Sequence, residues 1–151
     1  MVQDPVVALT DRDLLLHVAP AAEVVTHVVA EADVPLGDWT FFDGVGLPLT
    51  AETDDSGVLV GFVETSPGVV PSASDKQLLV DRLHSFLARA QVRLDAENAA
   101  AGGTPAHVRV PRVDGDLPDV ITALNAVMRL PTSQPDVRDW LHNLGHRLGL
   151  I

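Results

Sequence analysis

The residues best suited to chemistry are one aspartate and two histidines near the end of the chain. Asp139, His142 and His146 are spaced by three and four positions, so a helix would bring all three side chains to one side. Carboxylate and imidazole groups are ligands that zinc and other transition metals accept. The leucines of the same helix would lie almost opposite, which leaves the three polar groups facing water unless another element or subunit covers them. A solvated polar face is therefore the favoured interpretation, and a metal site is the alternative.

The other four histidines are scattered over different predicted elements. His17, His27, His84 and His107 show no spacing typical of metal ligands, although the fold could still bring some of them together. His84 flanks the apolar stripe of a helix, and His107 alternates with valines in a predicted strand. Both are therefore expected at boundary or surface positions.

Motifs for nucleotide, calcium or hydrolase chemistry are absent from the sequence. Residues 44–46 read Gly-Val-Gly after a strand, without the third glycine or the following helix of a dinucleotide fingerprint. The acidic turn at residues 114–119 has its glycine and proline in the wrong places for a calcium loop. Neither a P-loop nor a GxSxG motif is present. No catalytic residue and no cofactor are therefore predicted.

Composition excludes several kinds of partner. The formal net charge of −11 repels nucleic acid and anionic membranes, and four Phe, two Trp and no Tyr supply few rings for base stacking. The absence of cysteine excludes disulfides and thiolate sites. No basic region precedes an apolar run at the start, so a cytoplasmic protein is expected. Abundant Ala, Val and Asp, with nine Arg to one Lys, are typical of high-GC bacteria.

The first third of the chain is expected to hold one strand and two helices. Residues 6–9 form a β-branched apolar run that predicts a strand. Thr10 and the acidic residues after it predict a helix that continues to residue 18. Pro20 predicts the start of a second helix reaching about residue 33. Its expected buried face is Val24, Val25, Val28, Val29 and Ala32, and its expected exposed stripe is Glu23, His27 and Glu31.

The middle of the chain changes to the alternating pattern of strands. Strands are predicted over residues 39–42, 47–52 and 58–64, with turns at 43–46 and 54–57. The hairpin around residues 54–57 has the strongest turn signal, Asp-Asp-Ser-Gly. Pro48 lacks an amide donor, so its strand is expected at an edge of the sheet.

The remainder is predicted to be mostly helical. Ser74 and Gln77 match a capping box at the start of a helix whose stripe is Leu79, Leu83, Phe86, Ala90 and Leu94. Residues 106–113 alternate as a strand would. Asp116 is expected to cap a helix carrying Val120, Leu124 and Val127, and a last helix carries Val137, Leu141, Leu144, Leu148 and Ile151.

These elements predict a single α+β domain over residues 1–151, with a small mixed or antiparallel sheet packed by helices and two C-terminal helices. The ferredoxin-like βαββαβ order is one arrangement that fits them. The apolar side of the last helix would either pack on the core or form an interface, in which the contact residues are Trp140, Leu141, Leu144 and Leu148.

The functional hypothesis favoured by this pattern is a non-enzymatic, cytoplasmic protein-interaction module. It would act as an adaptor, an accessory subunit or a neutraliser of a basic protein, with no nucleic acid or membrane as partner. One alternative is a small-molecule-binding protein or enzyme, with a pocket between sheet and helices that uses some of Asp43, His84, His107 and Arg109. A further alternative is a subunit of a homo-oligomeric assembly.

Overall fold

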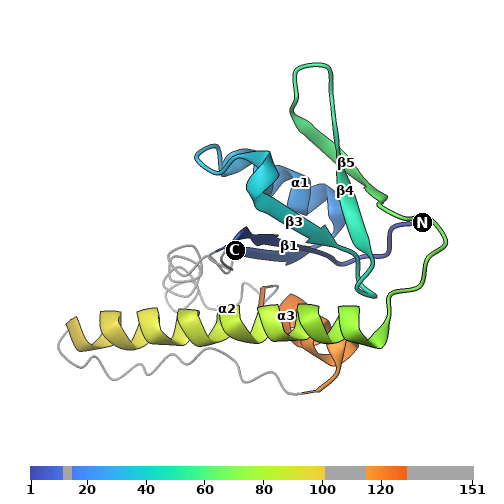
Figure 1. Cartoon of the computed structure of the whole chain (residues 1–151). Helices are drawn as coiled ribbons and strands as arrows, with labels where there is room; N and C mark the ends of the chain where they lie inside the picture. Colours follow the sequence, from blue (N-terminus) through green and yellow to red (C-terminus); the bar gives the residue numbers. More distant parts are fainter. Residues whose placement is uncertain (12–14, 101–114, 129–151) are drawn as a thin grey trace.

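The computed structural model describes residues 1–11, 15–100 and 115–128 (Figure 1). The chain begins with the β1 (Val6–Thr10) and β2 (Leu16–Ala19) hairpin, followed by helix α1 (Ala21–Ala30) and a 3-10 turn, η2 (Leu36–Asp38). Three further strands follow, and then two helices. Their bounds are β3 (Trp39–Phe42), β4 (Pro48–Thr53), β5 (Leu59–Glu64), α2 (Ala73–Ala100) and α3 (Leu117–Met128).

The strands form one five-stranded sheet in the order β2-β1-β3-β4-β5. Every neighbouring pair is antiparallel, and β1 pairs with both β2 and β3. The predicted α+β class with an antiparallel sheet is therefore confirmed. The strand order does not match the ferredoxin-like arrangement, which needs parallel neighbours joined by helical crossovers.

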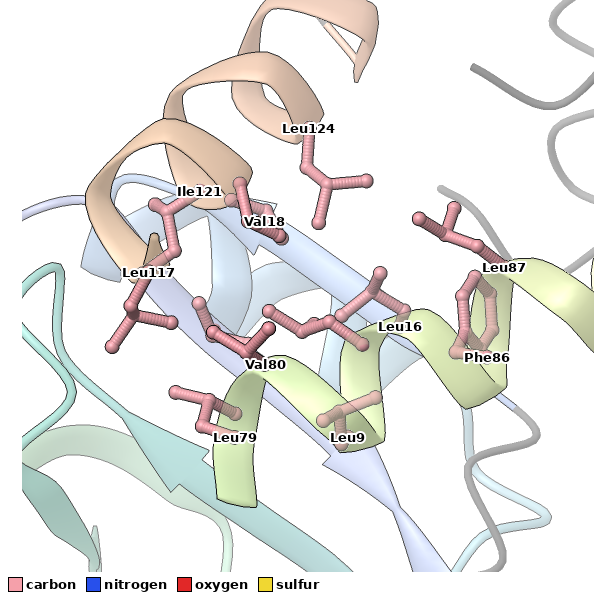
Figure 2. Packing of buried hydrophobic residues seen from close by; sticks show 13 residues of the cluster. Leu9, Leu16, Val18, Leu79, Val80, Phe86, Leu87, Leu117, Ile121 and Leu124 are labelled. Atoms are coloured by element: carbon pink, nitrogen blue, oxygen red, sulfur yellow. The ribbon is translucent and has the colours of Figure 1, made fainter. Parts of the chain in front are cut away.

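The sheet separates two layers of helices, with α1 on one face and α2 and α3 on the other (Figure 1). Strand β1 is buried on both faces, because its side chains alternate between two apolar cores. The α1 side includes Val6, Ala8, Val24, Trp39, Phe41, Leu49, Leu59 and Phe62. The other side joins β1 and β2 to α2 and α3 through Val7, Leu9, Leu16, Val18, Leu79, Leu83, Phe86, Leu117, Ile121 and Leu124 (Figure 2).

The helix predicted to run from Thr10 to residue 18 is wrong. Residues 16–19 form β2, which pairs with β1 in the register Val6 with Ala19 and Leu9 with Leu16. The Thr10 hydroxyl does accept a hydrogen bond, but from the amide of Leu15, five residues on, at 2.9 Å. A helix cap would bond two or three residues on, so this threonine closes a hairpin. Burial of β2 on both faces decides the outcome.

Two other local predictions are corrected by the structure. Strand β4 lies between β3 and β5, so Pro48 is not on an edge strand. It is tolerated because it is the first residue of its strand, where a missing amide disrupts little of the hydrogen bonding. The capping box lies two residues earlier than predicted, between Ser72 and Asp75. The Ser72 hydroxyl accepts from the Asp75 amide at 3.1 Å, and the Asp75 carboxylate accepts from the Ser72 amide at 3.1 Å.

The other helices predicted on described residues are present, but α1 ends at Ala30 rather than near residue 33, and Ala32 lies outside it and is exposed. Helix α1 begins directly after Pro20, and Leu79, Leu83 and Phe86 are the buried stripe of α2. Asp116 caps α3, since its carboxylate accepts from the amide of Asp119 at 3.3 Å. Helix α3 is the first of the two predicted C-terminal helices. The strand predicted at 106–113 and the last helix lie outside the described residues.

Two turns of the sheet share one pattern of hydrogen bonds but differ in burial. Residues 43–47 join β3 to β4, and residues 54–58 join β4 to β5. In each turn an aspartate carboxylate accepts from the amides two and four residues on. A glycine with positive φ follows three residues after the aspartate, Gly46 at 89° and Gly57 at 83°. In the first turn Asp43 and Gly46 are buried, with Gly46 against Leu117 of α3, whereas the second turn is exposed.

This pair of turns predicts different costs for the same substitution. Gly57→Ala should lose about 1 kcal/mol of stability, because only the strain of positive φ applies and nothing lies within 4 Å of the new Cβ. Gly46→Ala should lose about 3 kcal/mol, since its Cβ would also lie 2.6 Å from the Leu117 side chain in the core. Urea denaturation of both variants measures the difference. Equal losses would contradict the close packing of this turn against α3.

Candidate functional site

Most of the predicted site residues lie outside the described part of the chain. These are the possible metal ligands Asp139, His142 and His146, and the possible pocket residues His107 and Arg109. The proposed interface residues Trp140, Leu141, Leu144 and Leu148 lie outside it as well. Among the residues that the structure describes, no group of three or more His, Asp or Glu side chains could hold a metal ion. None of the described helices is long and apolar enough to cross a membrane.

Asp43 is fully buried, and both oxygens of its carboxylate accept hydrogen bonds from main-chain amides. Its Oδ1 accepts from the amides of Val45 at 3.0 Å and Leu47 at 2.9 Å, and its Oδ2 accepts from the amide of Gln3 at 3.3 Å. Both oxygens therefore hold the turn between β3 and β4 and join it to the first residues of the chain. His84, the other described member of the hypothetical pocket, is exposed on α2, as the sequence predicts. These positions give Asp43 a structural role.

The fold brings together two histidines that the sequence leaves apart. His17 on β2 is buried, and its ring stacks on that of His27 from α1, with centroids 4.9 Å apart and planes at 9°. Trp39 stacks on His17 from β3 at 5.5 Å. His27 was predicted on an exposed stripe, but it is half-buried because it packs on the ring of His17. The predicted buried residue Val29 is instead 46% exposed.

The row of rings continues across the face of the sheet that α1 covers. Trp39 contacts Phe41 at 6.4 Å, and Phe41 contacts Phe62 on β5 at 4.8 Å. Five of the rings in this part of the chain therefore join β2, α1, β3 and β5, through stacked contacts from His27 to Phe41 and a contact tilted by 50° between Phe41 and Phe62. The arrangement holds α1 on the sheet, and its rings are packed against one another. This gives the two histidines a packing role.

The exposed turn at the tip of the β4–β5 hairpin is organised by Asp54. Its Oδ1 accepts from the hydroxyl of Ser56 at 2.8 Å and from the amides of Ser56 and Val58. The Ser56 hydroxyl first, and the Val58 amide next, hold the pKa of the Asp54 carboxyl below its ordinary value. The turn therefore keeps a negative charge to low pH at the end of the hairpin.

Removal of the Ser56 hydroxyl should raise the pKa of Asp54 towards its ordinary value. A carboxyl with a lowered pKa in the folded state stabilises the fold above its unfolded pKa, near 4, and loses that contribution as pH falls through the folded pKa. The acid limb of the stability curve should therefore lose less in Ser56→Ala than in the wild type. Titration of the Asp54 carboxyl by NMR measures the shift. Asp75, whose pKa is lowered chiefly by the Ser72 hydroxyl, should not change and serves as the internal control.

Strand β5 forms one end of the sheet and pairs only with β4 among the described residues. The amide of Thr65 donates to the carbonyl of Pro48 at 3.1 Å, which makes these two a hydrogen-bonded pair. Such pairs alternate with non-hydrogen-bonded pairs along an antiparallel ladder. Val63 and Gly61 therefore face β4 with their main-chain groups, and those of Phe62 and Glu64 point outward.

Exposed valines lie along this end of the sheet. Val58, Val60 and Val63 are 45%, 57% and 42% exposed. Val60 is the extra residue of a β-bulge, because Thr53 pairs with Leu59 and Glu52 pairs with Gly61. In Figure 1 the tip of the β4–β5 hairpin stands clear of the helices. An apolar strand edge that ends a sheet is a surface on which proteins bind further strands.

The negative charge of the chain is concentrated in the first half of its sequence. Residues 1–75 contain thirteen Asp and Glu residues and a single basic one, Arg12, which gives a net charge of −12. Residues 76–151 contain eight acidic and nine basic residues, which gives +1 and accounts for the total of −11. The first segment holds the five strands of the described chain, α1 and the first three residues of α2, and the second holds the rest of α2 and α3. Among the described residues, α2 and α3 carry five acidic and four basic side chains, so the layer that they form is nearly neutral, whereas the layer of the sheet and α1 is strongly acidic.

The charge segregation is visible in the sequence as a run of 63 residues, 13–75, that contains no Lys or Arg. The free edge of β5 could not be found in this way, because it depends on the order of strands in the sheet. The candidate site is thus the β4–β5 hairpin, where the acidic layer and the exposed valines meet.

Comparison of the chain with known protein families, with characterised proteins and with solved structures finds no match.

Proposed function

We propose that this protein is a non-enzymatic interaction module that binds a basic protein through its acidic layer. The observation that carries the proposal is the segregation of charge, with −12 on residues 1–75 and +1 on the rest. A layer with one sign of charge attracts partners of the opposite sign and orients them during encounter. A uniform need for solubility would be met by acidic residues on either layer. The partner would therefore approach the sheet and α1 rather than α2 and α3.

The exposed acidic side chains are well placed for such contacts. Asp33 and Asp38 lie in the segment between α1 and β3, and Glu52 and Asp55 lie on the β4–β5 hairpin. All four are exposed. Each exposed charge contributes little to the free energy of binding, but a set of charges of one sign gives selectivity between basic and acidic partners and speeds association. This supports the roles of adaptor, accessory subunit or neutraliser of a basic protein.

Affinity isolation from a native extract tests this function with two matched variants. The test variant is Glu52→Gln with Asp55→Asn, and the control is Asp81→Asn with Asp119→Asn on α2 and α3. Each removes two exposed negative charges. We expect the wild type and the control to retain one stoichiometric basic protein, and the test variant to retain at most a third as much. Raising the salt concentration should release the partner, since screening weakens contacts between exposed charges.

Two results would contradict this function. The first is the absence of any stoichiometric partner from the extract, and the second is a partner whose retention is the same for both variants. A thermal-shift series with metals and metabolites addresses the alternative of a small-molecule binder. A ligand that binds only the folded state would raise the melting temperature.

A further inference from the structure

The free edge of β5 is the part of the acidic layer with the most specific geometry. It combines outward-facing main-chain groups with exposed valines and with negative charge. We propose that this edge binds an extended, lysine- or arginine-bearing segment of the partner protein as a sixth strand of the sheet. The proposal rests on the proposed function and specifies how the basic partner is recognised.

The main chain of β5 provides the hydrogen bonds for an added strand. The amide and carbonyl groups of Phe62 and Glu64 point away from β4, and no other strand pairs with them in the described part of the chain. A strand added beside β5 would donate to and accept from these groups at the normal spacing of a ladder. Phe62 itself is fixed by its ring in the core, so the edge is preorganised.

The bulge sets the length of the available edge. Val60 interrupts the register between β4 and β5, and such a bulge ends regular pairing on the bulged strand. The regular part of the edge is therefore residues 61–64, where Phe62 and Glu64 offer their main-chain groups and Val63 an apolar contact. A partner segment of four to six residues fits this edge. An added strand of this length binds weakly through its main chain, and its selectivity comes from side-chain contacts and charge.

Charge identifies the occupant as a basic segment. The hairpin and its two strands carry Glu52, Asp54, Asp55 and Glu64 and no Lys or Arg, and of these Glu64 is already paired with the terminal amine of Met1. Many proteins protect an edge strand with lysine, which is absent here. Pairing of two copies through β5 would bring Glu52, Asp54 and Asp55 near the same three residues of the second copy, and such like charges oppose association. A strand with lysine or arginine beside β-branched residues would meet the opposite charge.

Binding of a defined peptide to the labelled protein tests the proposal. The probe is an acetylated and amidated peptide of seven residues, alternating lysine and valine, and its control has glutamate in place of lysine. We expect the lysine peptide to shift the amide resonances of Phe62 and Glu64 and to slow their hydrogen exchange. The glutamate peptide should bind at least tenfold more weakly, because it adds negative charge to an acidic edge.

A matched pair of variants identifies the edge as the site. Val63→Lys places a positive charge on β5, and Leu78→Lys places the same charge on the exposed side of α2, where Leu78 is 63% exposed. We expect Val63→Lys to lower the affinity for the lysine peptide at least tenfold and Leu78→Lys to change it less than twofold. Thermal melts of both variants show whether they are folded before binding is compared.

The possible outcomes separate this proposal from the proposed function. If the peptide binds in a salt-dependent way but Val63→Lys binds it normally, the edge is not the site, and the function as a binder of basic proteins is retained. If the lysine peptide does not bind while the extract still yields a basic partner, strand addition is wrong. If neither binds, both proposals fail. Concentration-dependent shifts of β5 without peptide would identify a second copy as the occupant and overturn the basic segment.

Discussion

Asp43→Ala should lower the free energy of unfolding by about 3 kcal/mol. The carboxylate of Asp43 is fully buried and accepts hydrogen bonds from the amides of Gln3, Val45 and Leu47. Its removal leaves those three donors without their acceptor in a part of the structure where water has little access. For a chain of 151 residues, this loss corresponds to a decrease in Tm of roughly 10 °C. Urea denaturation at neutral pH measures it directly.

The exposed turn at residues 54–58, which has the same pattern of hydrogen bonds, provides the control for Asp43→Ala. Asp54 makes the same two bonds to the amides two and four residues on, but water can replace them at the tip of the hairpin. Asp54→Ala should therefore destabilise the protein much less than Asp43→Ala. Asp43→Asn should lie between, because its remaining oxygen can still serve Val45 and Leu47 while its amide group faces the donor of Gln3. Equal losses for Asp43→Ala and Asp54→Ala would show that burial does not strengthen this turn.

The local signals of the sequence predict much of the fold correctly. The strand at residues 6–9, the hairpin around 54–57 and the start of α1 after Pro20 are all confirmed. Each depends on interactions within a few residues, such as the Asp54 turn or the fixed φ of proline. Ser74 with Gln77 is a wrong prediction of the same kind, since Ser72 with Asp75 matches the same spacing and the local pattern does not choose between them.

Long-range pairing accounts for the larger errors. Leu16 and Val18 are apolar and fit either a helix or a buried strand, and the choice is made by β1, which lies beside them in the sheet. The position of β4 inside the sheet, despite Pro48, follows from the presence of β5 beyond it. The stacking of His17 on His27 also depends on how α1 lies over β2. For the same reason the free edge of β5, the main part of the candidate site, could not be inferred without the strand order.

The packing of α2 predicts the largest effect of a single substitution. Phe86→Ala should lower the free energy of unfolding by about 4 kcal/mol, because Phe86 is only 2% exposed and belongs to the core that joins α2 and α3 to β1 and β2. In Figure 2 its ring lies beside Leu87 on the side of α2 that faces the sheet. The cost combines the lost burial of the ring with the cavity left behind. Chemical denaturation gives the loss as a decrease in the midpoint at an unchanged slope.

Leu78→Ala on the same helix separates core packing from helix propensity. Leu78 is 63% exposed, and alanine is at least as good a helix former as leucine, so the loss should be within about 0.5 kcal/mol. A small loss for Phe86→Ala would mean that α2 does not cover this face of the sheet.

The Phe86→Ala variant also bears on the binding site, since β5 contacts α1 and β4 on the other side of the molecule. If Phe86→Ala remains folded, it should therefore bind the lysine peptide as the wild type does, because the α2 core and the β5 edge share no side chain.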